Sequence, residues 1–135
     1  MKNMKKMIIS PHIDDDVLGC GGIIDKNTFV LYCGVDEFHI ISKEDRLKEA
    51  DKVKNYLGHS YTLLNKKVNH YKVQDLIDSF QKHINSYKPD VICIPHPSYN
   101  QDHKVVYDAA MIATRPHDNN YFVKKVLLYE QPQVY

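Results

Sequence analysis

Residues 7–16 read MIISPHIDDD, an apolar run that passes directly into a group of ionisable side chains. The apolar part is short and does not alternate with polar residues, which is typical of a strand covered on both faces. His12, Asp14, Asp15 and Asp16 then bring one imidazole and three carboxylates into five residues. Because like charges at such short range raise one another's pKa, this group is costly unless a cation binds among them. The stretch therefore predicts a buried strand that ends at a divalent-metal site.

Similar apolar runs recur along the chain, and helical patterns lie between them. The predicted strands are Lys6–Ser10, Phe29–Cys33, Ser60–Leu64, Val91–Pro95 and Val126–Tyr129. A helix is predicted over Lys43–Leu57, with Ser42 as its N-cap and Gly58 as its stop signal. Two further helical stripes end before Pro89 and Pro116, and they consist of Val73, Leu76, Ile77, Phe80, Ile84 and Tyr87, and of Val106, Ala109, Ala110 and Ala113. Alternating strands and helices predict an α/β fold, a Rossmann-like three-layer sandwich with a mostly parallel sheet.

The composition indicates one globular domain over residues 1–135. A hydrophobic fraction of 43% and a charged fraction of 26% are ordinary for such a domain, which can bury a core at this length. The net charge of +1 does not point to nucleic acid or an anionic membrane as a partner. The apolar run after the basic start is too short for a signal peptide or a membrane span. Cys20, Cys33 and Cys93 lack metal-type spacing and are expected as reduced core residues, which favours a cytoplasmic location.

A second polar group, Asn100-Gln101-Asp102-His103, follows the predicted strand Val91–Pro95. Ligands of parallel sheets bind outside the carboxyl ends of the strands, and both polar groups are expected there. The two groups are therefore predicted to form one site. The structural alternative is that the first group only decorates a helix N-terminus, where the helix dipole favours anions.

Three residues of these groups are candidate metal ligands. His12 and Asp15 are three residues apart and can face one metal at a strand-to-helix turn. His103 is the best candidate for a third ligand, and His96 is the alternative. Such a set suits catalytic Zn²⁺, which keeps three protein ligands and one open position. Asp14 lies beside the ligands and is suited to accept a proton from water.

Gly19-Cys20-Gly21-Gly22 invites comparison with a dinucleotide-binding loop. Its spacing is not G-x-G-x-x-G, and its first glycine lies nine residues after the predicted strand end. Glycines inside a helix more often permit close packing against a sheet, and we interpret them in that way.

Several of these stretches resemble one known family. Pro11–Asp16 followed by Leu18–Gly22 resembles the opening motif of the LmbE-like/PIG-L family of zinc-dependent de-N-acetylases, P/A-H-P-D-D-E and a Gly-rich helix. Asn100–His103 resembles the second motif of that family, H/N-x-D-H. Further likenesses are Arg46-Leu47-Lys48-Glu49 ahead of Leu57-Gly58, Thr114-Arg115-Pro116 and Tyr129-Glu130. The resemblance follows the chain in order over almost its whole length.

The resemblance implies a role for each matching position. The implied roles are zinc ligands for His12, Asp15 and His103, general base for Asp14 and support of the site for Asp102, with one Zn²⁺ per chain. Asn100 stands where other members have a histidine that stabilises the tetrahedral intermediate or protonates the amine. An amide can donate a hydrogen bond to an oxyanion but cannot deliver a proton at neutral pH. Asp14 would then act as both base and acid, or a group such as His96 would assist.

The implied reaction is hydrolysis of a linear amide. It would remove the acetyl group from an N-acetylated amino sugar, such as N-acetylglucosamine, or from a glycoconjugate. Arg46 and Arg115 are candidates to meet a phosphate or carboxylate of this small-molecule substrate, and His96 is a further polar candidate. Arg46 is equally suited to a structural salt bridge with Glu49.

The sequence also departs from the family pattern and leaves alternatives open. Ile13 replaces the usual Pro, Asp16 replaces the usual Glu, and the chain is shorter at its C-terminus than typical members. A metal-dependent phosphoesterase is one alternative, although it usually needs more acidic ligands for two metals. A non-catalytic relative that binds a sugar or a partner is another. Specificity is expected in the loops Val35–Ile41 and Lys66–Tyr71, and a homo-oligomer is compatible with the sequence.

Overall fold

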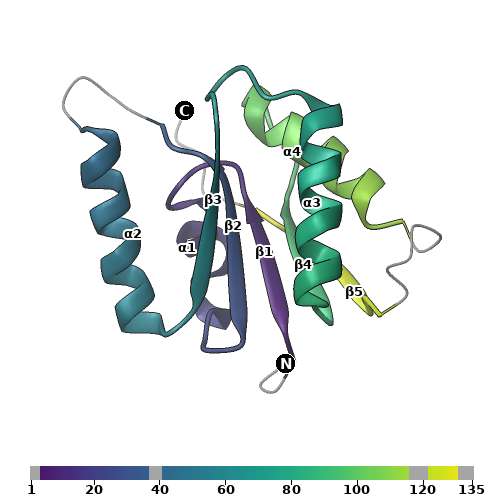
Figure 1. Cartoon of the computed structure of the whole chain (residues 1–135), viewed down its shortest axis with the longest axis horizontal. Coiled ribbons are helices and arrows are strands. Elements are labelled where there is room, and N and C mark those ends of the chain that lie inside the picture. The colour runs from purple at the N-terminus through teal and green to yellow at the C-terminus, as the bar shows by residue number, and fades with distance from the viewer. Residues whose placement is uncertain (1–3, 37–40, 116–121, 131–135) are drawn as a thin grey trace.

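The computed structural model describes residues 4–36, 41–115 and 122–130 (Figure 1). Its strands are β1 Lys6–Ser10, β2 Thr28–Gly34, β3 Ser60–Lys66, β4 Val91–Pro95 and β5 Lys125–Tyr129. Its helices are α1 Asp15–Cys20, α2 Lys43–Leu57, α3 Val73–Tyr87 and α4 Gln101–Ala113, and a short 3₁₀ helix, η1, covers Gly21–Ile23. The strands form one sheet in the order β3-β2-β1-β4-β5, and all neighbouring pairs are parallel.

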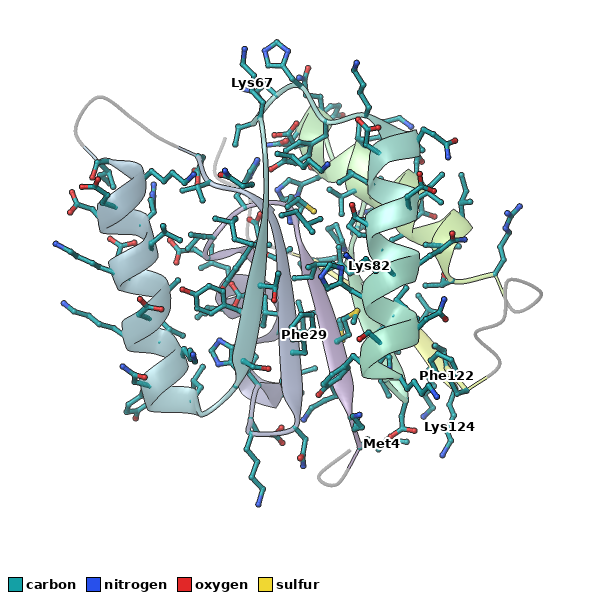
Figure 2. All side chains as sticks on the ribbon, viewed as in Figure 1. Met4, Phe29, Lys67, Lys82, Phe122 and Lys124 are labelled. Atoms are coloured by element: carbon teal, nitrogen blue, oxygen red, sulfur yellow. The ribbon has the colours of Figure 1, made fainter. Side chains whose placement is uncertain are left out.

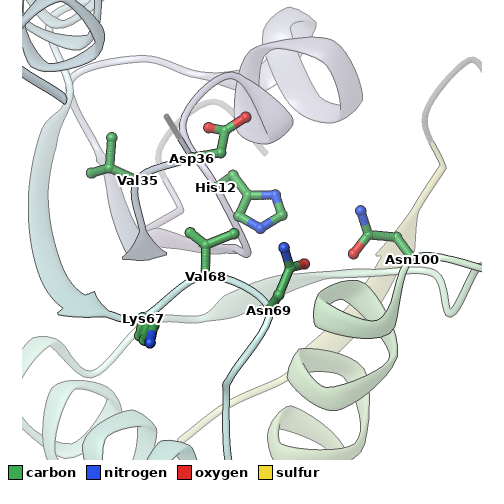
Figure 3. Close-up of a pocket in the computed structure, with 7 residues that line it drawn as sticks. All are labelled: His12, Val35, Asp36, Lys67, Val68, Asn69 and Asn100. Atoms are coloured by element: carbon green, nitrogen blue, oxygen red, sulfur yellow. The ribbon is translucent and has the colours of Figure 1, made fainter. Parts of the chain in front are cut away.

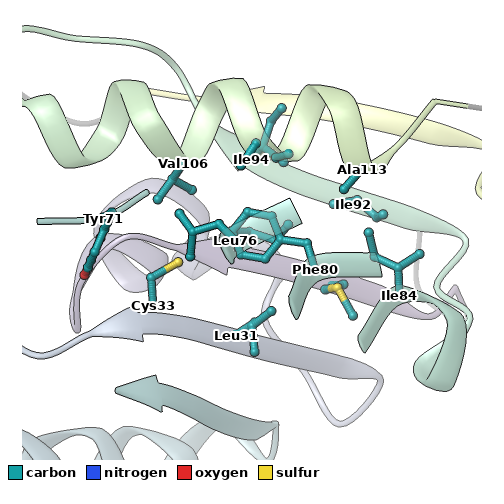
Figure 4. Packing of buried hydrophobic residues seen from close by; sticks show 14 residues of the cluster. Leu31, Cys33, Tyr71, Leu76, Phe80, Ile84, Ile92, Ile94, Val106 and Ala113 are labelled. Atoms are coloured by element: carbon teal, nitrogen blue, oxygen red, sulfur yellow. The ribbon is translucent and has the colours of Figure 1, made fainter. Parts of the chain in front are cut away.

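Helices cover both faces of this sheet and give the molecule three layers (Figure 1). On one face, Leu76 and Phe80 of α3 pack with α4 and with strand residues such as Ile92 (Figure 4). On the other face, Cys20 of α1 and Ala50 of α2 belong to a second buried cluster. The predicted Rossmann-like three-layer sandwich is therefore confirmed, and the sheet in the described residues is wholly parallel.

The predicted bounds of most helices and strands agree closely with those in the structure. β1 and β4 have the predicted bounds, while β2, β3 and β5 each extend by one or two residues beyond them. Ser42 caps α2 as predicted, because its side chain accepts a hydrogen bond from the Asp45 backbone N–H at 3.2 Å. Gly58 ends the same helix with a φ of 85°, a left-handed conformation that glycine adopts without steric cost.

The strand order places the polar groups at a reversal of the sheet. From β1 the chain moves outward through β2 to β3, and it then returns to the other side of β1 to form β4 and β5. Such reversals open a crevice at the carboxyl ends of the two central strands. Both polar groups follow those ends, since Pro11–Asp14 leads out of β1 and α4 follows β4.

The predicted packing roles of the cysteines and of two glycines can be compared with the structure. Cys20, Cys33 and Cys93 are buried and free, as predicted for core residues. A Cβ on Gly19 would overlap the ring of Tyr129, so this glycine does permit close packing. Gly22 has no such neighbour within 4 Å in the described part of the chain, and the packing interpretation does not extend to it. None of the helices in the described residues is long and apolar enough to cross a membrane.

Candidate metal centre

The turn between β1 and α1 is fixed by hydrogen bonds among its own residues. The Ser10 hydroxyl donates to the His12 carbonyl oxygen at 2.5 Å, and the His12 N–H donates to Asp15 Oδ2 at 2.9 Å. Asp14 has a φ of 84° and immediately precedes the first residue of α1. The Tyr71 hydroxyl reaches over from the β3–α3 loop and donates to the Pro11 carbonyl at 2.6 Å. These bonds hold the His12 and Asp15 side chains on the same side of the turn.

The three residues expected as ligands converge. Asp15 Oδ2 lies 3.6 Å from His12 Nδ1 and 3.4 Å from His103 Nε2. One potential ligand atom from each residue lies within 4.8 Å of the others, and all three residues are buried. Two imidazole nitrogens and one carboxylate oxygen form a donor set that Zn²⁺ accepts in catalytic sites. Among the described residues, this is the one group of three or more such side chains with that convergence.

Asp102 orients one of these imidazoles. Its Oδ2 lies 2.8 Å from His12 Nε2 and accepts a further hydrogen bond from the Asn69 backbone N–H at 2.9 Å. When Nε2 carries the imidazole proton and donates to Asp102, His12 Nδ1 keeps its lone pair on the side of Asp15. A carboxylate behind a ligating histidine fixes the tautomer and ring orientation in this way. Asp102 thus contacts a candidate ligand and is not itself a member of the convergent group.

Asn100 positions the helix that carries His103. Its side-chain oxygen accepts hydrogen bonds from the backbone N–H groups of Asp102 at 2.9 Å and His103 at 3.4 Å, so Asn100 is the N-cap of α4. Its amide NH₂ group is then the part that can donate to a ligand. This cap also places Asp102 and His103 in the first turn of the helix, next to the residues that follow β1.

Asp14 contacts Arg46 and is not a member of the convergent group of His12, Asp15 and His103. Arg46 Nη1 lies 3.2 Å from Asp14 Oδ2 and 3.6 Å from Glu49 Oε2, and its Nη2 lies 3.9 Å from Asp36 Oδ2. The salt bridge between Arg46 and Glu49 that the sequence suggested is therefore present. The same Arg46 guanidinium also contacts Asp14. Burial raises the pKa of the Asp14 carboxyl, Glu49 and Asp36 raise it further, and Arg46 opposes them. A carboxylate whose pKa is moved toward neutrality in this way is suited to proton transfer.

Asp16 has a structural partner. It is fully buried, and the Tyr32 hydroxyl donates to its Oδ2 at 2.8 Å. Burial raises the pKa of the Asp16 carboxyl to about 6. The shorter side chain at this position thus bonds α1 to β2 and does not join the ligand group.

A pocket of about 490 Å³ adjoins the candidate ligands (Figure 3). The residues that line it are His12, Val35, Asp36, Lys67, Val68, Asn69 and Asn100. Most of them come from the described parts of the two loops in which specificity was expected. Sequence reasoning did not single out Asp36 or Asn69, because neither belongs to a motif. The one signal for Asp36 was its place just after the carboxyl end of β2.

None of the three expected substrate-binding residues is among the described residues that line this pocket, and Arg46 contacts Asp14, Asp36 and Glu49 instead. His96 is exposed directly after β4, where its backbone N–H donates to the Tyr129 carbonyl at 2.9 Å. Arg115 follows the C-terminal end of α4, and its Nε donates to the Ile112 carbonyl at 3.2 Å. His103 lies in the first turn of that helix, so about 15 Å of helix axis separates it from Ala113, two residues before Arg115. His96, the alternative third ligand, is also outside the convergent group.

Comparisons with known proteins show the fold and not the family. No family model and no curated protein matches the sequence. Among solved structures, the conserved protein TT1542 from Thermus thermophilus matches with a TM-score of 0.78 and 17% identity, over 98% of this chain and 68% of that one. GalB, the 4-carboxy-2-hydroxymuconate hydratase from Pseudomonas putida KT2440, matches with a TM-score of 0.69 and 19% identity, over 82% and 55%. The A40926 pseudoaglycone deacetylase Dbv21 matches with a TM-score of 0.67 and 17% identity, over 93% and 64%.

These matches establish which kinds of protein share this architecture. The chain has a fold that is also found in a deacetylase and in a hydratase, and it spans between 55% and 68% of the length of the three structures. A fold that carries two different reactions does not by itself decide the chemistry. The reaction has to be argued from the site.

Proposed function

We propose that this protein is a zinc-dependent amidohydrolase of the LmbE-like/PIG-L type, which removes the acetyl group from an N-acetylated amino sugar or glycoconjugate. The observation that carries the proposal is the buried convergence of His12, Asp15 and His103 beside a pocket. The structural match to a deacetylase supports it. The single convergent group in the described residues does not favour a two-metal phosphoesterase.

The donor set is compatible with zinc. His12, Asp15 and His103 would hold the ion, because two nitrogens and one oxygen are the ligand types of catalytic zinc and leave a position open. Bound zinc would lower the pKa of water to about 7 and polarise a carbonyl group. Asp102 would keep His12 in the ligating tautomer through the 2.8 Å contact with Nε2.

The chain's own residues would handle the proton and the developing charge. Asp14 would accept the proton of the attacking water and return it to the leaving amine, a role that its raised pKa supports. Arg46 would hold the Asp14 carboxylate in place through the 3.2 Å contact. The Asn100 amide, which lines the pocket, would donate a hydrogen bond to the oxyanion while its oxygen caps α4.

Release of acetate tests this proposal. The zinc-loaded protein is incubated with N-acetylglucosamine and its phosphorylated and glycosylated derivatives, and acetate is measured. The control is Asp14→Asn, because asparagine tolerates the positive φ of 84° at this position. We expect Asp14→Asn to retain zinc and to lower kcat by about 10² to 10⁴. Stoichiometric zinc binding without acetate release from any of these compounds would favour a non-catalytic binding protein instead.

A further inference from the structure

The edge strand β5 presents apolar side chains on both faces of the sheet. In the described residues, β5 is the outermost strand next to β4 (Figure 1). Leu127 is 37% exposed and Leu128 is 46% exposed. Leu127 lies on the same face as Tyr129, which packs against Gly19 of α1. Leu128 lies on the opposite face with Val126, which packs against the buried cluster that includes residues of α3 and α4. Exposed apolar residues on both faces of an edge strand favour pairing with another strand.

The backbone of β5 is oriented for such pairing. The Tyr129 carbonyl accepts a hydrogen bond from His96, directly after β4, so Tyr129 turns its backbone groups toward β4. Backbone groups alternate sides along a strand. Leu127 therefore also faces β4, and the N–H and C=O groups of Val126 and Leu128 face the outer edge.

The sequence of the strand is complementary to itself. Residues 124–130 read KKVLLYE. If two copies pair antiparallel about a two-fold axis at Leu127, Lys124 of each copy lies opposite Glu130 of the other. Val126 then lies opposite Leu128, and these are the residues whose backbone groups face outward. An axis at Val126 would instead put Lys124 opposite Leu128 and lose the charge pairing.

The charged ends of the strand are accessible to a second copy. Figure 2 shows Lys124 at the margin of the molecule, and its side chain is 66% exposed. Its contact with Asp90 within the chain is long, at 3.8 Å, and Glu130 is exposed. Oppositely charged residues that face each other across a strand pair are stabilising, and like charges there are destabilising.

We propose that β5 is the interface of a symmetric homodimer, in which two copies pair antiparallel at Leu127 and join their sheets. The interface is isologous, as two-fold dimers require. Two pairs of Val126 and Leu128 exchange backbone hydrogen bonds, and two pairs of Lys124 and Glu130 close the ends. A strand pair of this length buries less than the roughly 800 Å² per partner of a standard interface. The dimer is therefore expected to form in a concentration-dependent way.

Sedimentation across a micromolar concentration series tests the interface. We expect a monomer–dimer equilibrium for the unmodified chain and a monomer for Leu127→Lys, which places two ammonium groups face to face. Tyr56→Lys is the matched control, because Tyr56 is 89% exposed on α2 and lies away from β5. Its equilibrium should equal that of the unmodified chain. A monomer at every concentration, or an equal effect of both substitutions, would overturn the proposal.

Charge reversal tests the register. Glu130→Lys should weaken dimerisation about tenfold or more, and adding Lys124→Glu should restore most of the loss. Leu127→Cys should give a cross-linked dimer on mild oxidation, because the two-fold axis brings the thiol opposite its own copy. Tyr99→Cys, at a position 95% exposed in the loop between β4 and α4 and outside β5, is the control. No rescue by the double reversal, or equal cross-linking of both cysteine variants, would overturn the antiparallel register.

Discussion

At the scale of single residues, the candidate site concentrates buried polar groups that need a partner. His12, Asp15, Asp102 and His103 are each at most 8% exposed. Burying unpaired ionised groups is costly, and two of these four are carboxylates. Hydrogen bonds to backbone N–H groups stabilise Asp15 and Asp102 in part. A bound cation would complete this stabilisation.

The contact between Asp102 and His12 makes a specific prediction about metal affinity. Asp102→Ala removes the acceptor that fixes the ring and tautomer of His12, so zinc should bind about 10- to 100-fold more weakly while still binding at the same stoichiometry. Isothermal titration of the metal-free protein measures this. Asp108→Ala, on the same helix and paired with Lys104 at 3.3 Å, is the control and should leave affinity unchanged. If Asp102→Ala and the unmodified protein bound zinc with equal affinity, Asp102 would have no role in metal binding.

His59 makes a prediction about pH. It is 2% exposed, and neither of its ring nitrogens has a hydrogen-bond partner among the described residues. Burial, with Lys54, lowers the pKa of its imidazole. The unfolded chain therefore takes up a proton near pH 6.5, before the folded chain does, and the free energy of unfolding falls as pH drops below that value. His59→Phe removes this contribution, so its stability relative to the unmodified protein should rise between pH 7 and pH 5. Urea unfolding at several pH values measures the difference, and a constant difference would contradict the account.

At the scale of elements, strong local signals made much of the fold predictable. Ser42 and Gly58 marked both ends of α2, and uninterrupted apolar runs marked β1 and β4. The bounds of α1 were not predictable, because a helix of six residues that begins after a positive φ at Asp14 has no periodic pattern. No motif marked Asp36 or Asn69 as residues of the pocket wall, since loop positions are set by tertiary contacts such as the hydrogen bond from the Asn69 backbone to Asp102.

The convergence of the candidate ligands was easier to predict than the residues that line the pocket. His12, Asp15 and His103 lie at strand ends that a parallel sheet brings together, and their convergence follows from topology. Arg115 was chosen from a local resemblance, and helix length places it away from the pocket. The partners of Arg46 within the described residues include Asp36, a contact across the fold that no spacing revealed.

Gly34 tests how tightly these elements pack beside the pocket. A Cβ at Gly34 would lie 2.6 Å from the Lys66 carbonyl oxygen and closer still to the Tyr71 hydroxyl, which bonds to Pro11. Gly34→Ala should therefore lower the free energy of unfolding by about 1 to 3 kcal/mol. Gly22→Ala is the matched control, because none of the described residues comes within 4 Å of a Cβ at this position, and it should change stability by less than about 0.5 kcal/mol. Equal stability of the two variants in urea unfolding would contradict this packing.

At the scale of the whole molecule, the parallel sheet accounts for the site. The reversal between β1 and β4 brings two distant segments, around residues 12 and 102, to the same crevice. The same architecture is found in solved structures of a hydratase and a deacetylase. The proposed chemistry therefore depends on the convergent side chains, and the central claim is that His12, Asp15 and His103 bind one zinc ion.

The zinc content of the purified protein tests that claim most directly. It is measured by elemental analysis after equilibration with zinc, for the unmodified chain and for His12→Ala, Asp15→Ala and His103→Ala. His83→Ala is the control, because His83 lies on α3 outside the ligand group. We expect about one zinc per chain in the unmodified protein and in the control, and loss of the metal in each ligand variant. No zinc in the unmodified protein, or full zinc content in the ligand variants, would contradict the account.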